Sequence, residues 1–168
     1  MTSPASSPSS SPLGLPALPA GYAAIGLHNP KNLQNVGGVL RAAYCFGAAF
    51  VAIAGSRYRT QSTDTAKAYR FLPVFQVDDL HSVVPFDCVP VAVERMADAT
   101  PLPDYAHPER AFYLFGPEDG DLGRALTQWC RDLIYIPSDD SLNLAAAVNI
   151  VLYDRLAKGM RALRRAAP

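Results

Sequence analysis

The stretch that decides the fold is residues 134–154, which read IYIPSDDSLNLAAAVNIVLYD. A short apolar run, 134–136, stops at Pro137 and is followed by four polar residues of the kind that cap helices. From 142 to 152 the sequence predicts a buried helix, apolar on almost every side. A strand, a polar turn and a helix start together form a corner with unpaired backbone N–H groups at the carboxyl end of a strand. Open α/β sheets bind their ligands at such corners.

Upstream of this corner, short apolar runs alternate with segments of helical periodicity. The predicted strands are 23–27, 49–54, 73–77, 88–93 and 111–115, and the predicted helices are 33–46, 66–71 and 122–130, with a weak element at 80–84 and a loop at 100–108. Strands that are unbroken apolar runs indicate an α/β fold with a mainly parallel sheet and helices on both faces. Pro90 favours an edge position for the strand 88–93, because proline cannot donate a backbone hydrogen bond.

The chain has 168 residues, and its hydrophobic fraction of 49% is typical of a globular protein. Residues 1–20 are uncharged and rich in proline and serine, which predicts a disordered tail before a single domain at 21–168. With 15 basic and 15 acidic residues the formal net charge is zero, so any binding of nucleic acid must depend on a local patch.

Cysteine and histidine usage gives no sign of a metal or a disulfide framework. The three cysteines are far apart and no CxxC spacing occurs, which favours reduced thiols and a cytoplasmic location. We expect no metal and no membrane association, since no apolar run is long enough to span a bilayer. The phosphate-binding GxxxxGK[ST] and dinucleotide-binding GxGxxG patterns are also missing.

The first of three polar clusters follows the first predicted strand and contains Asn35 and Arg41. Six residues separate them, so they lie on different sides of an ideal helix. Gly37 and Gly38 would each cost roughly 1 kcal/mol inside a helix relative to alanine, which suggests the close approach of another backbone or a ligand. An equally simple interpretation makes Arg41 a surface helix residue.

The second and third clusters follow later strands. Gly116 and Glu118 end the strand 111–115, where a glycine lets a ligand or chain segment lie against the backbone, although an ordinary β-turn explains them too. In the third cluster, Ser141 and Asn143 open the buried helix, and Ser141 is also a candidate N-cap.

Taken together, the three clusters resemble the signature motifs of the TrmH/SpoU family of RNA ribose 2′-O-methyltransferases, in the SPOUT class. The first motif corresponds to Asn35 through Arg41, the second to Gly116 and Glu118, and the third to Ile136-Pro137 followed by the run Ser141-Leu142-Asn143. The resemblance extends over about residues 22–163. The acidic third loop and Ala145, where the family often has serine, are departures from the pattern.

The resemblance implies a C-terminal deep trefoil knot, a homodimer and methyl transfer from S-adenosyl-L-methionine to a ribose 2′-hydroxyl of tRNA or rRNA, without a metal. The catalytic residues would be Arg41, Asn35, Glu118, Ser141 and Asn143. The cofactor-binding residues would be Leu114, Phe115, Gly116, Ile134, Ile136, Pro137, Ser141 and Leu144. Arg41 would reach toward the cofactor of the other subunit as a fixed cation, because a guanidinium does not deprotonate in proteins.

RNA is expected across a basic surface near the carboxyl edge of the sheet, formed by Arg57, Arg59, Lys67 and Arg70. The last helix also ends in cations, which suit the helix dipole and a solvated end as well as a binding role. Three alternatives stay open: a wobble-position tRNA 2′-O-methyltransferase of the minimal single-domain type, a non-catalytic knotted RNA-binding protein, and a flavodoxin-like nucleotide-binding protein.

Overall fold

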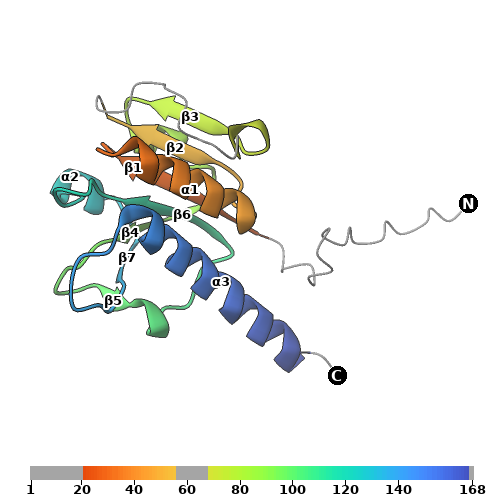
Figure 1. The fold of residues 1–168 in the computed structure, drawn as a ribbon. Helices are drawn as coiled ribbons and strands as arrows, with labels where there is room; N and C mark the ends of the chain where they lie inside the picture. The colour runs from red at the N-terminus through yellow and green to blue at the C-terminus, as the bar shows by residue number, and fades with distance from the viewer. Residues whose placement is uncertain (1–20, 56–67, 167–168) are drawn as a thin grey trace, which may run out of the picture.

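A computed structural model describes residues 21–55 and 68–166 as a single α/β layer structure (Figure 1). The elements, with η for a short 3-10 helix, follow in the order β1 (Tyr22–His28), α1 (Leu33–Cys45), β2 (Val51–Ala54), η1 (Ala68–Arg70), β3 (Val74–Val77), η2 (Leu80–Val83), β4 (Val89–Val93), β5 (Thr100–Pro101), η3 (Leu102–Asp104), β6 (Arg110–Phe115), α2 (Arg124–Thr127), β7 (Asp132–Tyr135) and α3 (Leu144–Ala166).

The seven strands form one sheet in the order β3-β2-β1-β6-β4-β7-β5, and every pairing is parallel. This confirms the predicted parallel sheet. The central strands β1, β2 and β6 are almost completely buried, which is why they read as continuous apolar runs without alternation. Because all strands run the same way, their carboxyl ends share one edge of the sheet.

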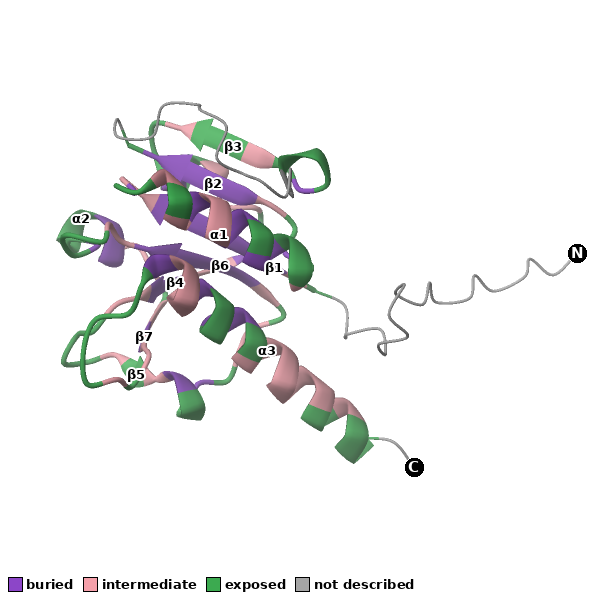
Figure 2. Cartoon of the chain, viewed as in Figure 1, coloured by how far each residue is buried: buried purple, intermediate pink, exposed green. Residues whose placement is uncertain are grey.

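The two faces of the sheet are covered unequally (Figures 1 and 2). Helices α1 and α3 pack against each other and against one face, enclosing the larger core around Ile25, Val39 and Val148. On the other face, η2 and the short α2 contribute Leu80 and Leu126 to a smaller core. Helical elements therefore cover both faces, as predicted.

The prediction that Pro90 marks an edge strand is wrong, since β4 lies inside the sheet between β6 and β7. Pairing with β7 begins one residue later, at Val91, and the Pro90 carbonyl still accepts a 3.0 Å hydrogen bond from the Arg131 backbone N–H. Because pairing with β7 starts only after Pro90, the missing N–H of the proline interrupts no pair of that ladder.

Several boundaries differ from those predicted. Segment 100–108 was expected to be a loop, but it contains β5, which pairs with β7, and η3. Helix α2 is shorter than 122–130, and β7 begins before 134. Helix α3 starts at Leu144 and is buried on one side only, since Ile150 and Tyr153 are 37% and 63% exposed. None of the described helices is long and apolar enough to cross a membrane.

Candidate active site

Three segments far apart in the sequence meet at the carboxyl edge of the sheet through a chain of hydrogen bonds. The Asn35 side chain, on the first turn of α1, donates to Glu118 Oε1 at 2.7 Å. Asn143, just before α3, donates from Nδ2 to Asn35 Oδ1 at 2.8 Å. The three predicted clusters are thus one structural unit, joined by side chains that sequence spacing alone could not bring together.

Glu118 binds the start of α1. Its carboxylate accepts hydrogen bonds from the backbone N–H groups of Lys31 at 2.8 Å and Asn32 at 3.2 Å, where the helix dipole favours negative charge. Partial burial raises the pKa of Glu118, but the hydrogen bonds from Lys31, Asn35 and Asn32 outweigh it, so the net pKa lies below its ordinary value. The carboxylate is therefore ionised at neutral pH and fixed in place.

Asn143 caps α3, and this corrects the expectation that Ser141 is the N-cap. The Asn143 Oδ1 atom accepts from the backbone N–H groups of Ala145 at 2.9 Å and Ala146 at 3.3 Å, as an N-cap does. Ser141 lies before the helix, and its N–H donates to Asp140 Oδ1 at 2.7 Å. Asn143 holds both the helix start and Asn35.

Two glycines explain how the segments approach so closely. A Cβ atom at Gly38 would lie 2.8 Å from the Ala145 Cβ, so α1 and α3 could not cross at this distance with a larger residue. A Cβ at Gly116 would lie 3.0 Å from the Leu122 backbone N. At both glycines another part of this chain packs closely against the backbone, as the sequence suggested.

A cavity of about 430 Å³ lies beside this chain of hydrogen bonds, at the ends of β4, β6 and β7. The predicted cofactor-binding residues that line it are Phe115, Gly116, Ile136, Ser141 and Leu144, together with Glu118. Leu114 and Ile134 are completely buried in the cores on the two faces of the sheet, so their side chains do not line the cavity. Pro137 lines a neighbouring hollow.

Among the residues of the cavity wall that the sequence did not predict are Glu94 and Arg95, which directly follow β4. Glu94 Oε2 accepts a 3.0 Å hydrogen bond from the Leu122 N–H. The Arg95 guanidinium donates to the Ser138 carbonyl and lies 3.4 Å from Ser138 Oγ. The signal was present: charged residues follow a predicted strand, as in the other clusters, and the same rule applied to 88–93 would have found them.

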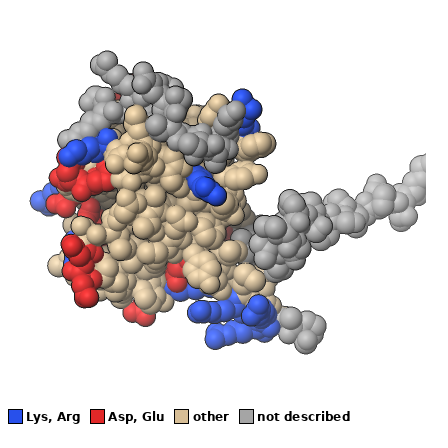
Figure 3. All heavy atoms as spheres, viewed as in Figure 1, with Lys and Arg blue, Asp and Glu red and all other residues tan. Residues whose placement is uncertain are grey.

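The rim of the cavity is predominantly acidic, and Asp and Glu side chains gather on this side in Figure 3. The charged residues that line the cavity are Glu94, Arg95, Glu118, Asp121, Asp139 and Asp140. Such a surface attracts a cationic ligand and repels phosphate. Within residues 21–55 and 68–166, no three His, Cys, Asp or Glu side chains gather as a metal site would require.

Arg41 stands apart from the cavity and does not line it. It lies on α1 about 9 Å along the helix axis from Asn35 and on another side of the helix. Its side chain is exposed and makes no hydrogen bond or ion pair with the described part of the chain. The structure of the chain thus does not bring Asn35 and Arg41 together.

Of the predicted RNA-binding residues, Arg57, Arg59 and Lys67 lie outside the described residues. Arg70 is exposed in η1, four residues before β3 begins. This places Arg70 near the amino edge of the sheet rather than the carboxyl edge, because the chain between two parallel strands must return to the opposite edge. The expected position of Arg70 is therefore corrected.

Comparisons with solved structures agree with the fold. The chain is similar to the SpoU methyltransferase AviRb from Streptomyces viridochromogenes, with a TM-score of 0.77, 20% identity and coverage of 92% of this chain and 66% of that one. It is also similar to the AdoMet-bound rRNA methyltransferase from Sinorhizobium meliloti, with a TM-score of 0.72, 23% identity and coverage of 83% and 57%. The chain thus spans about two thirds or less of the length of these proteins.

A third structure, described in connection with 2-OH methylation of C/U34 on tRNA, matches with a TM-score of 0.71 and 22% identity, over 87% of this chain and 94% of that one. A search of curated proteins found no match. The family profile "SpoU rRNA Methylase family" matches residues 22–153, which include all three hydrogen-bonded segments and the cavity. The chain belongs to the SpoU rRNA methylase family.

Proposed function

We propose that this protein transfers a methyl group from S-adenosyl-L-methionine to a ribose 2′-hydroxyl of tRNA or rRNA. The observation that carries the proposal is the hydrogen-bonded chain from Glu118 through Asn35 to Asn143, beside a cavity, in a member of the SpoU family. Methyl transfer needs positioning of two reactants and stabilisation of the charge that develops, and a rigid polar frame supplies both.

The cavity fits the cofactor in size and chemistry. Its volume of about 430 Å³ is within the range of small-molecule sites. Phe115, Ile136 and Leu144 offer apolar walls for an adenine ring, and the acidic rim suits a sulfonium and an ammonium group. When bound, S-adenosyl-L-methionine supplies an electrophilic methyl group on sulfur.

The residues of the site divide the work. Glu118 fixes Asn35 and the start of α1, and Asn143 fixes Asn35 from the other side. Each amide NH₂ has a second hydrogen that can donate to a substrate oxygen. Arg41 stabilises the negative charge that develops on the ribose oxygen and holds the neighbouring phosphate. Ser141 shapes the cavity wall.

The proposal includes a homodimer in which Arg41 acts on the site of the partner subunit. Arg41 is remote from its own cavity and shares the exposed side of α1 with Tyr44, which is 51% exposed. On the adjoining α3, Ile150 and Tyr153 are also exposed, and Tyr153 packs edge-on against Phe46 with ring centroids 6.4 Å apart. A self-complementary apolar face of this kind suits a two-fold dimer.

The trefoil knot is likewise part of the proposal. The last strand, β7, lies inside the sheet between β4 and β5 rather than at an edge, and α3 returns to pack against α1. A chain that inserts its last strand between earlier ones is consistent with threading of residues 114–144, which is otherwise rare in proteins.

A second candidate is methylation at the wobble position of tRNA. The protein described with 2-OH methylation of C/U34 is covered over 94% of its length, whereas the rRNA methyltransferase from Sinorhizobium meliloti is covered over 57%. Because the match extends over nearly the whole length of both chains, it favours a minimal single-domain enzyme. Methylation of a tRNA transcript that is lost when nucleotide 34 carries a 2′-deoxyribose would select this candidate.

Calorimetry with S-adenosyl-L-methionine and subunit mixing test the proposal. The wild-type protein should bind the cofactor. Gly116→Leu should not, because its side chain would collide with the Leu122 backbone and displace the wall of the cavity. Mixing Arg41→Ala with Asn143→Ala protein should restore about a quarter of wild-type activity, since half of randomly formed dimers have one intact site of two. No cofactor binding would favour a non-catalytic RNA-binding protein, and no restoration would place Arg41 in its own subunit's site.

A further inference from the structure

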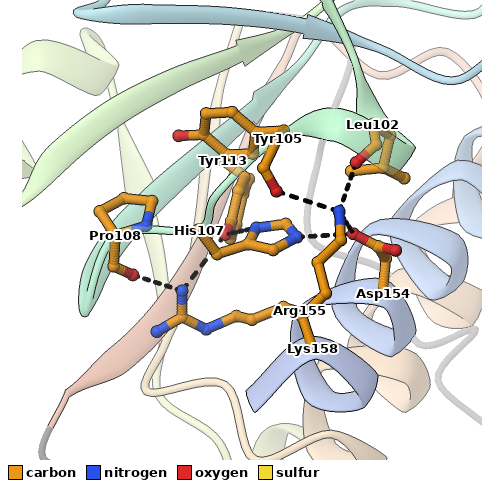
Figure 4. A network of polar contacts seen from close by, with 8 residues as sticks. All are labelled: Leu102, Tyr105, His107, Pro108, Tyr113, Asp154, Arg155 and Lys158. Atoms are coloured by element: carbon orange, nitrogen blue, oxygen red, sulfur yellow. Dashed lines mark hydrogen bonds and ion pairs between the residues drawn. The ribbon is translucent and has the colours of Figure 1, made fainter. Parts of the chain in front are cut away.

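The second half of α3 carries five cations that the site does not use: Arg155, Lys158, Arg161, Arg164 and Arg165. They separate into two sets by the direction of their side chains. Two turn inward to the protein (Figure 4) and three point outward at the end of the helix, where Lys and Arg side chains gather in Figure 3. The two sets have different chemistry available to them.

The inward pair, Arg155 and Lys158, donates to acceptors of the protein. Arg155 donates to the carbonyl oxygens of Pro108 at 2.6 Å and Glu109 at 2.5 Å. Lys158 donates to the Leu102 carbonyl at 2.6 Å and pairs with Asp154 at 2.6 Å. These contacts fasten α3 to the segment before β6 and occupy both terminal nitrogens of Arg155 and the ammonium of Lys158.

The outward set, Arg161, Arg164 and Arg165, forms what we term the arginine stripe. Their spacing of three and four residues puts them on one face of the helix, with Cβ atoms about 5–6 Å apart. All three are exposed, and none has a hydrogen bond or ion pair with the described part of the chain. Like charges at this spacing repel one another along the helix, and a bound polyanion would remove that repulsion.

We infer that the arginine stripe binds the phosphate backbone of the RNA substrate, an inference that rests on the proposed function. The rim of the cavity is acidic and repels phosphate, so RNA affinity must come from another surface. All three cations are arginine, whose planar fork matches phosphate oxygens. At this end of α3, three cations without a partner among the described residues lie next to one another on one face of the helix.

The position of the stripe sets the size of the RNA. Twenty residues of helix separate Leu144, in the cavity wall, from Arg164, which is about 30 Å. A helical RNA that reaches both within one subunit needs about nine base pairs at roughly 3.4 Å each. We therefore expect a stem of that length to contact both, whereas a stacked oligonucleotide of four or five nucleotides would not reach from one to the other.

The test is the salt dependence of RNA binding, measured by fluorescence anisotropy on a tRNA-sized transcript. The variant Arg161→Gln/Arg164→Gln/Arg165→Gln should lower the slope of log Kd against log salt by about two to three, since each phosphate contact contributes roughly 0.7 in a single strand and 0.9 in a duplex. Binding of a five-nucleotide oligomer and calorimetric cofactor binding should stay unchanged. The triple lysine variant, which keeps the charges, should retain most of the slope.

Matched single changes separate the stripe from general charge. Arg164→Gln should weaken binding of the transcript severalfold, whereas Arg124→Gln, an exposed cation on α2, should not. An unchanged slope in the triple variant with normal methyl transfer would overturn the inference and leave the proposed function intact. Loss of binding to anionic phospholipid vesicles, with RNA binding unchanged, would also overturn it. A wild-type protein that shows the stripe-dependent slope but binds no cofactor would refute the function alone.

Discussion

Two hydrogen-bonded networks contact α3, one at its start and one in its second half, and they use their polar groups in opposite ways. At the start, Glu118, Asn35 and Asn143 lie at the surface beside the cavity. In the second half, His107 bridges Tyr113, at 2.6 Å from Nδ1, and Asp154, at 2.9 Å from Nε2, and its side chain is only 5% exposed (Figure 4). We term the second group the His107 network; its members are His107, Tyr113, Asp154, Arg155 and Lys158.

The difference lies in what remains available for a ligand. In the His107 network each donor ends on an acceptor of the protein, so its energy goes into holding α3 on the sheet. At the start of α3 each amide NH₂ uses one hydrogen and keeps another for a substrate. Hydrogen-bond donors that have no protein acceptor and lie beside a cavity indicate a role in function. Donors that are already bonded to the protein in the interior indicate a role in stability. The following changes test that distinction.

Arg41→Ala should have the largest effect. The side chain has no hydrogen-bond or ion-pair partner in the described part of the chain, so folding should be unaffected. Methyl transfer should fall by about 10³-fold, because the developing negative charge would lose its cation. Steady-state kinetics with labelled cofactor would measure this. A loss of less than tenfold, in protein that binds cofactor normally, would remove Arg41 from the mechanism.

Glu118→Gln should reduce kcat by about 10- to 100-fold. The amide would present hydrogens to a backbone N–H and to Asn35, so both would lose their fixed positions. Glu109→Gln is the matched control, an exposed side chain on the opposite edge of the sheet, and should leave kcat unchanged. Equal effects of the two substitutions would show that Glu118 has no positioning role.

Asp154→Ala should reverse the pattern and affect stability more than activity. It removes the acceptor of the His107 N–H and the carboxylate that pairs with the Lys158 ammonium, which keeps the Leu102 and Tyr105 carbonyls. We expect this to lower the free energy of unfolding by about 2 kcal/mol. The value is below that of a fully buried pair because both charged side chains are about a quarter exposed. Asp104→Ala, an exposed neighbour, should change stability by less than about 0.5 kcal/mol in urea unfolding. A larger loss of activity than of stability would contradict the distinction.

The pH dependence of stability gives the smallest effect. Burial lowers the pKa of His107, against the opposing influence of Asp154, and the cations Lys158 and Arg155 lower it further. An unfolded histidine titrates near 6.5, so below that pH the unfolded chain takes up a proton that the folded chain does not, and stability falls.

The slope that His107 contributes is at most about 1.4 kcal/mol per pH unit. His107→Gln should flatten the decline between pH 7.5 and 5.5, where the carboxylates stay ionised. Burial also lowers the pKa of His28, so the decline should flatten without vanishing. An identical pH profile for wild type and variant would show that His107 takes up its proton equally in both states.

The sheet could be predicted from the sequence because a parallel sheet buried on both faces requires unbroken apolar strands, as in β1 and β6. The placement of β4 could not, since Pro90 breaks no pairing at that position and only the tertiary register reveals this. β5 was missed because its two residues are a strand only by pairing with β7.

Of the site, the three polar clusters were predictable because each follows a strand. Their mutual contacts were not, because Asn35 and Glu118 are 83 residues apart. The exclusion of Leu114 and Ile134 from the cavity depends on which face of a strand turns outward, which an all-apolar run does not reveal. The His107 network was invisible for the same reason: 47 residues separate His107 from Asp154.

The most direct test of the central claim is nucleoside analysis after methyl transfer to total RNA from cells that lack this gene. With labelled S-adenosyl-L-methionine, the wild-type protein should produce a 2′-O-methyl nucleoside, and Arg41→Ala protein should produce none. Label on a base, or no label with protein that binds the cofactor, would contradict the account.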